Sequence, residues 1–190
     1  MKDGPISLIV VDMQKGMKEP AAGVRNNPDA ERNILTLLTA WRNASWPVVH
    51  VRHISRTPDS PFWPGRPGAE FQPELAPLDD EHVVEKNVPD AFVHTGLERW
   101  LHVRGLGQVV IVGVSTNHSI ESTARSAGNL GFKTTVVSDA TFTFAQEDYA
   151  GIPRTADEVH AMSLANLAGE YTTIVSAAEA LKLPGSRRPL

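Results

Sequence analysis

Two residues of opposite charge stand at the ends of apolar segments, a placement that suits acid–base chemistry. Asp12 follows the apolar run 6–11, and Lys86 follows the strand-like segment 82–85. An ammonium group close to a carboxylate favours its ionised form, whereas burial opposes ionisation. A carboxylate balanced between these effects can both take and give protons near neutral pH. The alternative is a structural ion pair at the edge of a sheet, and position alone does not exclude it.

A third candidate is the segment 113–119, Gly-Val-Ser-Thr-Asn-His-Ser, where a strongly apolar segment turns into a helical pattern. Backbone N–H groups in the first turn of a helix lack intrahelical partners, and with the positive helix end they favour an anion or a developing oxyanion. Ser119 lies where its side chain could face such a site. Helix starts commonly carry polar residues, so the alternative is that Thr116 and Asn117 are ordinary caps and Ser119 an ordinary first-turn serine.

The elements that must position these residues alternate regularly along the chain. Ile34, Leu37, Leu38 and Trp41 form one stripe of a helix, for which Asn27 and the proline after it suggest the start. Capping boxes predict two further helix starts, one at Thr95 with Glu98 and one at Thr155 with Glu158. Strand-like segments lie at residues 6–11, 47–51, 82–85, 109–114, 133–137 and 171–175.

Strand and helix in steady alternation predict an α/β protein whose parallel sheet is covered on both faces. We expect one domain over residues 1–190, with residues 184–190 as a frayed tail and a long irregular loop at 53–80. Ligands of such sheets bind beyond the carboxyl ends of the strands. The residues that end the predicted strands are therefore the ones to inspect: Asp12, His53, Lys86, residues 115–119 and Asp139.

Composition excludes several classes of protein. The chain has no cysteine, which excludes disulfides, thiolate zinc sites and a thiol nucleophile. A net charge of −4 argues against nucleic acid as a partner. No apolar run approaches the roughly 20 residues of a membrane span, and no basic-then-apolar leader precedes the first strand. We therefore expect a cytoplasmic protein with a small-molecule substrate.

Four motifs in order give the chain a family resemblance: LIVVDMQ with Asp12, VVEKNVPDAF with Lys86, VIVGVSTNHSIESTARSAGNLGF, and VVSDATFTF. The chain resembles the isochorismatase-like, or cysteine hydrolase, superfamily over roughly residues 5–182. That group includes nicotinamidases, N-carbamoylsarcosine amidohydrolases, ureidoacrylate and biuret hydrolases, and isochorismatases. The resemblance implies a three-layer Rossmann-like fold, a sheet of about six strands in the order 3-2-1-4-5-6, and a homo-oligomeric hydrolase, a dimer or larger.

The resemblance also implies roles for individual residues. Asp12 resembles the general acid/base of the family, and Lys86 the lysine beside it. The Val114–Ser115 bond resembles a non-proline cis peptide that directs the N–H of Ser115, together with that of Ser119, at an oxyanion. The chain departs from the family pattern at Ser119, where the usual residue is cysteine. A serine hydroxyl is a much poorer nucleophile without a strong base.

This departure leaves three functional readings open. In the first, Asp12 protonates a vinyl ether and water completes the cleavage, as in isochorismatases, which lack the nucleophilic cysteine. In the second, the protein is an amidase- or ureidase-type hydrolase with Ser119 at the nucleophile position and little or no turnover. In the third, it is a catalytically dead member used for binding or assembly, although the presence of both Asp12 and Lys86 argues against this.

The remaining expectations concern the pocket. Arginines at positions 52, 56 and 66 either meet a substrate carboxylate or lie in a solvated loop, and Asp139 is expected to brace loops. Nicotinamidases place zinc after the second strand, but the chain lacks their Asp-x-His pair near His50, His53 and Asp59. We therefore expect no metal site and no cofactor. The predicted pocket walls, with core packing or a structural role as the alternative, are Gln14, Phe62, Trp63, Phe92 and His118.

Overall fold

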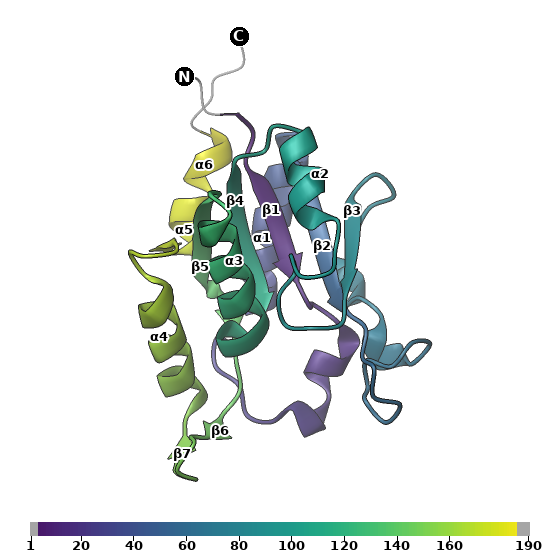
Figure 1. The fold of residues 1–190 in the computed structure, drawn as a ribbon, viewed down its shortest axis with the longest axis vertical. Helices are drawn as coiled ribbons and strands as arrows, with labels where there is room; N and C mark the ends of the chain where they lie inside the picture. Colours follow the sequence, from purple (N-terminus) through teal and green to yellow (C-terminus); the bar gives the residue numbers. More distant parts are fainter. Residues whose placement is uncertain (1–3, 186–190) are drawn as a thin grey trace.

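The computed structural model describes residues 4–185, which fold into a central sheet between two layers of helices (Figure 1). The six strands are parallel and lie in the order β3-β2-β1-β4-β5-β8. Counted along the chain, these six strands have the predicted order 3-2-1-4-5-6. Their bounds are β1 Ser7–Val11, β2 Val48–His53, β3 His82–Lys86, β4 Gln108–Val114, β5 Lys133–Phe142 and β8 Thr173–Val175.

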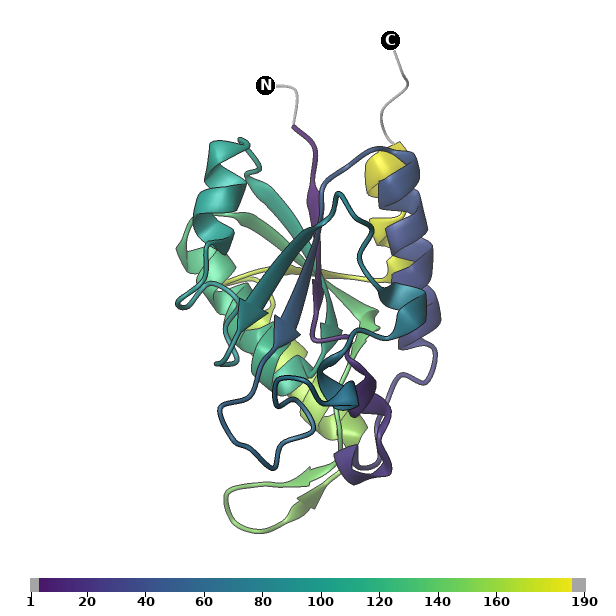
Figure 2. The same cartoon turned by 90° about the vertical axis from the view of Figure 1, so that its right-hand side faces the viewer.

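The helices cover both faces of the sheet, as Figure 2 shows nearly edge-on. Helices α1, α5 and α6 pack on one face, and α2, α3 and α4 pack on the other. The helix bounds are α1 Ala30–Asn43, α2 Leu97–Val103, α3 Glu121–Asn129, α4 Ala156–Leu167, α5 Ala177–Ala180 and α6 Lys182–Gly185. None of these helices has the length and apolar character that crossing a bilayer demands.

Two hydrophobic cores, one on each face, hold the layers together. In β1, Leu8 contacts the α1 side while Ile9 contacts the α2–α3 side, because successive side chains of a strand point to opposite faces. All five residues of β1 are buried, which explains its continuous apolar sequence. The predicted stripe of α1, from Ile34 to Trp41, is fully buried in the first core.

Two predicted helix starts are wrong, and one is confirmed. Helix α1 begins at Ala30, and the side-chain amide of Asn27 instead donates to two backbone carbonyl groups of β5. Helix α2 begins at Leu97 without a capping box, because the hydroxyl of Thr95 donates to a backbone carbonyl four residues earlier. The capping box of Thr155 and Glu158 at the start of α4 is present as predicted.

Other differences lie at the edges of the fold. Strand β5 extends beyond the predicted end, to Phe142. A short hairpin, β6 Gln146–Glu147 with β7 Pro153–Arg154, was not predicted and projects at the lower end of Figure 1. The predicted tail begins too early, since α6 runs to Gly185, and residues 186–190 lie outside the described part. The loop after β2 has two 3₁₀ turns, Pro67–Ala69 and Pro73–Leu75.

Candidate active site

Asp12, Lys86 and Ser119 meet at the carboxyl edge of the sheet, as their strand-end positions predicted. Asp12 follows β1, Lys86 ends β3, and Ser119 lies in the turn after β4. Lys86 Nζ lies 2.7 Å from Asp12 Oδ2 and 3.1 Å from Ser119 Oγ. Ser119 Oγ donates to the same Asp12 oxygen at 2.6 Å. Each of the three side chains therefore contacts both of the others.

The two charges of this cluster are almost inaccessible to solvent. The side chains of Lys86 and Asp12 are 0% and 2% exposed. Asp12 Oδ2 accepts two hydrogen bonds, whereas Oδ1 is buried and has no hydrogen-bond partner among residues 4–185. A buried acceptor without a partner costs about 1–3 kcal/mol. Such a group in a folded protein calls for an explanation, and an atom reserved for a ligand or a transferred proton is one.

The backbone at Asp12 is also unusual. Its φ is +54°, in the left-handed region that a residue with a Cβ rarely adopts. This conformation costs about 1–2 kcal/mol for an L-residue, and such outliers cluster at functional sites. Asp12 N–H donates to the Val51 carbonyl at 2.8 Å, so the strained residue is tied to the neighbouring strand β2. The conformation turns the chain out of β1 directly after the carboxylate.

The turn after β4 holds Ser119, and we call residues 115–120 the Ser119 turn. The Val114–Ser115 peptide bond is cis, as the resemblance implied. Thr116–Ile120 is a π-helical turn, in which Ile120 N–H donates to the Ser115 carbonyl at 3.1 Å, rather than the ordinary helix start that the sequence suggested. Single π-helical turns are frequent at functional sites.

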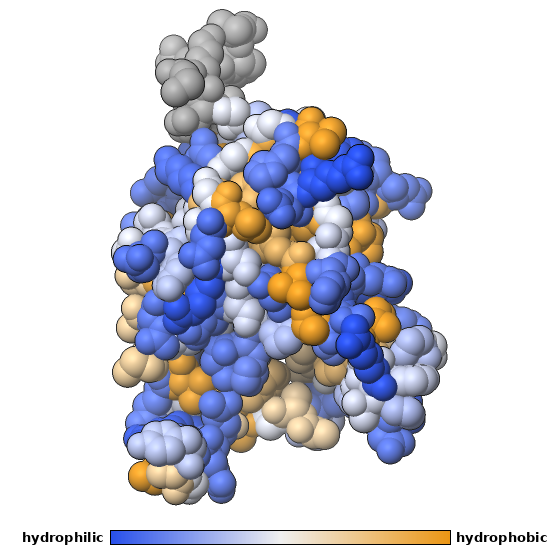
Figure 3. All heavy atoms as spheres, viewed as in Figure 1, coloured by the Kyte–Doolittle hydropathy of each residue, from blue (hydrophilic) through white to orange (hydrophobic). Residues whose placement is uncertain are grey.

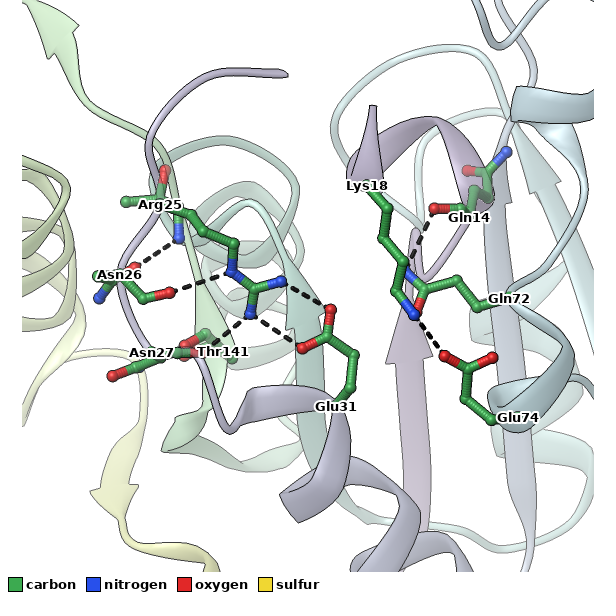
Figure 4. Close-up of polar contacts among 10 residues, drawn as sticks. Gln14, Lys18, Arg25, Asn26, Asn27, Glu31, Gln72, Glu74 and Thr141 are labelled. Atoms are coloured by element: carbon green, nitrogen blue, oxygen red, sulfur yellow. Dashed lines mark hydrogen bonds and ion pairs between the residues drawn. The ribbon is translucent and has the colours of Figure 1, made fainter. Parts of the chain in front are cut away.

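Gln14, predicted to line the pocket, holds the loop that follows β2. It is fully buried, and its Nε2 donates to the carbonyl groups of His53 and Ala69, both at 2.9 Å. Its Oε1 accepts from His53 N–H at 2.8 Å. Gln72 in turn donates to the Gln14 carbonyl at 3.3 Å (Figure 4). Both hydrogen atoms of the Gln14 side-chain amide are therefore donated to backbone carbonyl groups of the protein.

The other predicted wall residues lie in the segments that follow β2, β3 and β4. Phe92 packs against Phe132, with ring centroids 5.7 Å apart, so the core-packing alternative describes it. His118 is exposed, and its ring contacts the side chain of Asn117 at 3.2 Å. Trp63 is half-buried in the loop after β2. Within residues 4–185, no hydrogen bond joins Trp63, Phe92 or His118 to the polar cluster.

The three arginines considered for a substrate carboxylate are differently placed. Arg52 pairs with Glu85 on the neighbouring edge strand. Arg56 donates to Asn87 Oδ1 at 2.8 Å, directly after Lys86 in the chain. Arg66 contacts a backbone carbonyl within its own loop. Arg52 and Arg56 therefore bind the residues directly before and after Lys86, whereas Arg66 does not.

His53 lies close to the charged cluster, which the sequence motifs did not predict. It pairs in register with Lys86 at the end of β2, and its ring lies edge-on to Phe62 with centroids 6.2 Å apart. Burial lowers the pKa of His53, the Lys86 charge lowers it further, and Asp12 opposes both effects. The imidazole is therefore neutral at neutral pH. Its position at the end of a strand was the only signal in the sequence.

Two further expectations concern polar residues away from the cluster. Asp139 braces α5, because its Oδ1 accepts from Ala177 N–H at 2.6 Å. His50 is fully buried and lies 3.0 Å from Glu81 Oε2. Among residues 4–185, no group of three or more His, Asp or Glu side chains is arranged to hold a metal ion.

Comparisons with known proteins show the family to which this fold belongs. Residues 7–179 match the model of the isochorismatase domain. The isochorismatase family protein YrdC of Bacillus subtilis is 38% identical over 170 residues, which cover 90% of this chain and 91% of that protein. Nicotinamidase 3 of Arabidopsis thaliana is 30% identical over 182 residues, covering 89% and 83%. A crystal structure of an isochorismatase-family protein from Chromobacterium violaceum has a TM-score of 0.95 and 44% identity, covering 98% and 97%. The chain therefore belongs to the isochorismatase family of hydrolases.

Proposed function

We propose that the protein hydrolyses a small molecule with Asp12 as its general acid and base. The observation that carries this proposal is the asymmetry of the buried carboxylate. Its Oδ2 accepts from Lys86 and Ser119, while its Oδ1 has no partner in the described chain. Lys86 supplies the compensating charge, and the backbone N–H groups of Ser115 and Ser119 are the proposed donors to a developing oxyanion.

In a non-covalent scheme, Ser119 is not consumed. Asp12 protonates the vinyl ether of the substrate, water adds to the cation that results, and the C–O bond then breaks. Asp12 is free to exchange this proton through Oδ1, because Oδ2 is occupied. This scheme requires only the carboxylate and the ammonium beside it.

One observation favours a second scheme, amide or ureide hydrolysis through Ser119. Its hydroxyl donates to Asp12 Oδ2 at 2.6 Å and receives a contact from Lys86 Nζ at 3.1 Å, so a base and a cation both lie at the oxygen. Asp12 would take the hydroxyl proton while Oγ attacks the carbonyl carbon, and would give the proton to the leaving amine. Water would then cleave the ester by the same route. Nicotinamidase 3, with 30% identity, is named for amide hydrolysis.

Three variants on one responsive substrate separate these schemes. A panel of amides, ureides and isochorismate, followed separately for ammonia and for pyruvate, identifies the substrate. Asp12→Asn keeps the shape and removes the titrating group, so turnover should fall by about 10²–10⁴-fold in both schemes. Unchanged turnover would refute the proposal.

Ser119 then decides between the schemes. Ser119→Ala should cost little in the non-covalent scheme, because alanine keeps the backbone N–H, but should abolish turnover if Oγ is the nucleophile. Ser119→Cys should raise activity on an amide if the chain is an amidase weakened by its serine. We further propose a cytoplasmic location, which cell fractionation checks, and self-association, which is treated below.

A further inference from the structure

The Ser119 turn lies against helix α4, and the contact centres on Thr116. Thr116 is fully buried, and both of its polar oxygens contact α4 side chains. Its Oγ1 lies 2.8 Å from His160 Nδ1, and its carbonyl oxygen lies 3.0 Å from Ser163 Oγ. Ser163 Oγ also lies 2.6 Å from Glu121 Oε2, so its single hydrogen is shared between two acceptors. The hydrogen bond between Thr116 and His160, unlike that of Ser163, is therefore not shared with a second acceptor.

The neighbours of His160 define which ring nitrogen carries hydrogen. Asn27 Nδ2 lies 3.5 Å from His160 Nε2, but its two hydrogens are already directed to the carbonyl groups of Ser138 at 2.9 Å and Thr141 at 2.6 Å. The Ser138 carbonyl also raises the pKa of His160, because a carbonyl oxygen near the ring favours an N–H on it. These neighbours favour the tautomer with the hydrogen on Nε2, in which Nδ1 has the lone pair that accepts from the Thr116 hydroxyl.

The surroundings keep His160 in this neutral form. Burial lowers the pKa of His160, and the Ser138 carbonyl and the Asp157 carboxylate oppose this only in part. A protonated ring would present N–H at both nitrogens and could no longer accept from Thr116. At neutral pH the ring thus bridges three separate elements: α4, the β5 carbonyl of Ser138, and the Ser119 turn.

We propose that His160 is a positioning residue that holds Thr116, and through it the Ser119 turn, so that Ser119 Oγ meets Asp12 and Lys86. The inference rests on the proposed roles of Asp12 and Ser119. The π-helical turn is a rare backbone form, here with the bond from Ile120 N–H to the Ser115 carbonyl, and we expect contacts from outside the turn to help hold it in place. Reacting groups must be held to within about 0.5 Å, which supporting hydrogen bonds provide.

The absence of cysteine from the chain allows a direct test without a known substrate. Ser119→Cys introduces a single thiol at the centre of the cluster. Only the thiolate reacts with iodoacetamide; the ammonium group of Lys86, 3.1 Å from the serine oxygen, favours the thiolate, whereas the Asp12 carboxylate, 2.6 Å from it, opposes it. The alkylation rate as a function of pH, followed by intact-protein mass spectrometry, thus reports how the introduced thiol lies relative to Lys86.

Variants in this Ser119→Cys background test His160. His160→Leu and Thr116→Val each remove one side of the hydrogen bond and should shift the alkylation midpoint, because the thiol then lies differently relative to the Lys86 ammonium and the Asp12 carboxylate. A rise of one unit in the thiol pKa lowers the rate at a pH below it by about tenfold. His160→Asn offers an acceptor oxygen near the position of Nδ1 and should restore most of the parent rate.

The matched control is Leu167→Ala, which removes a fully buried side chain from the same helix without touching Thr116. It should lower the melting temperature but leave the alkylation midpoint unchanged. The inference is overturned if His160→Leu and Thr116→Val lower only the melting temperature, or if Leu167→Ala shifts the midpoint equally. If His160→Leu fails to fold, Thr116→Val and His160→Asn decide by the same readout.

A different result would refute the proposed function itself. If Lys86→Met in the Ser119→Cys background left the alkylation midpoint unchanged, the influence of Lys86 on position 119, and with it the proposed chemistry, would be in error. The variants would still be compared by rate, since accessibility of the thiol also depends on the position of the turn. Turnover by the Asp12 and Ser119 variants is a separate measurement on the serine-containing protein.

Discussion

Lys86 and Asp12 bring two full charges into a place that solvent hardly reaches. Removing ions from water costs several kcal/mol for each, and their mutual attraction offsets this only when the geometry is good. The 2.7 Å contact between Nζ and Oδ2 and the Ser119 hydroxyl bond meet that condition on one side of the carboxylate. Oδ1, which has no partner among residues 4–185, does not meet the condition of good geometry. The arrangement therefore serves chemistry more than stability.

Removing one charge of the pair should lower the stability of the protein. Lys86→Met keeps the length of the side chain but leaves the Asp12 carboxylate buried without an opposite charge, with only the Ser119 hydroxyl bound to it. The free energy of unfolding, measured by urea denaturation, should fall by about 3–5 kcal/mol. In the double variant Asp12→Asn with Lys86→Met both charges are gone, and most of the loss should be recovered.

Lys15 provides the control, because its ion pair with Glu70 is exposed. Lys15→Met should change the free energy of unfolding by less than about 1 kcal/mol. Equal losses for Lys15→Met and Lys86→Met would show that the buried pair has no special energetic weight.

At the scale of elements, Glu81 connects α1 to β2. Its carboxylate receives two hydrogen bonds of 2.8 Å from Arg42 of α1 and lies 3.0 Å from Nε2 of buried His50 in β2. Burial alone would raise the pKa of Glu81, but the bonds from Arg42 and His50 outweigh it and hold the pKa far below the ordinary value of 4.5. The ionised carboxylate therefore stabilises the fold.

The contribution of Glu81 to the free energy of unfolding depends on pH. Because the pKa of Glu81 is lowered in the folded state, its contribution is fully present above the unfolded value of about 4.5 and is lost as the pH falls through the folded value. Glu81→Gln should be less stable than the parent at pH 7 by roughly 2 kcal/mol, the scale of a hydrogen bond to a charged group. In urea titrations between pH 7 and pH 3, this difference should shrink as the pH falls. A difference independent of pH would exclude the carboxylate charge as its cause.

Gly113 makes the close approach of β4 to β1 possible. Its φ is +122°, and a Cβ there would lie 2.0 Å from the Val11 carbonyl oxygen. The pairing of β4 with β5 is also irregular at this point, between Ile111 and Gly113. Gly113 in β4 thus pairs with Val11, the residue before Asp12 in β1. It also directly precedes Val114, whose peptide bond to Ser115 is cis.

Gly113→Ala should lower the melting temperature strongly and reduce turnover further, because relieving the clash separates the strands that carry Asp12 and Ser119. A loss above about 3 kcal/mol in the free energy of unfolding is expected for backbone strain of this kind. Gly107→Ala is the matched control, since an added Cβ there meets nothing within 4 Å. If both variants lost the same stability, the contact with Val11 would not be the cause.

At the scale of the whole molecule, one end exposes apolar side chains. Tyr149 and Ile152 of the hairpin region and Met162 of α4 are 104%, 50% and 63% exposed. In Figure 3 the lower left end, over the hairpin, is mostly hydrophilic, with a small group of orange and tan atoms at its tip. Exposed apolar side chains that gather on one face are typical of protein interfaces.

We therefore expect the chain to self-associate through this face. Light scattering at micromolar concentration should give at least twice the chain mass, and Met162→Glu with Tyr149→Glu should reduce it to the monomer. Val103→Glu, at an equally exposed position of α2, should leave the assembly intact. A monomeric parent protein would contradict the prediction, and dissociation by Val103→Glu alone would place the interface elsewhere.

The sequence alone determined the elements whose information is local. The buried stripe from Ile34 to Trp41, the apolar strand before Asp12 and the capping box at Thr155 all depend on residues a few positions apart. Because parallel strands end at one edge of a sheet, the meeting of Asp12, Lys86 and Ser119 also followed from sequence, with the motifs marking which strand ends mattered.

Only the tertiary structure decided how that centre is supported. Asn27 resembled a helix cap, but its amide reaches carbonyl groups 111 and 114 residues away in the sequence. The roles of Gln14 and His160 likewise depend on partners 39 to 55 and 44 residues distant. Polar side chains take whichever partner the folded chain brings within about 3 Å, and neither periodicity nor spacing along the sequence contains that distance.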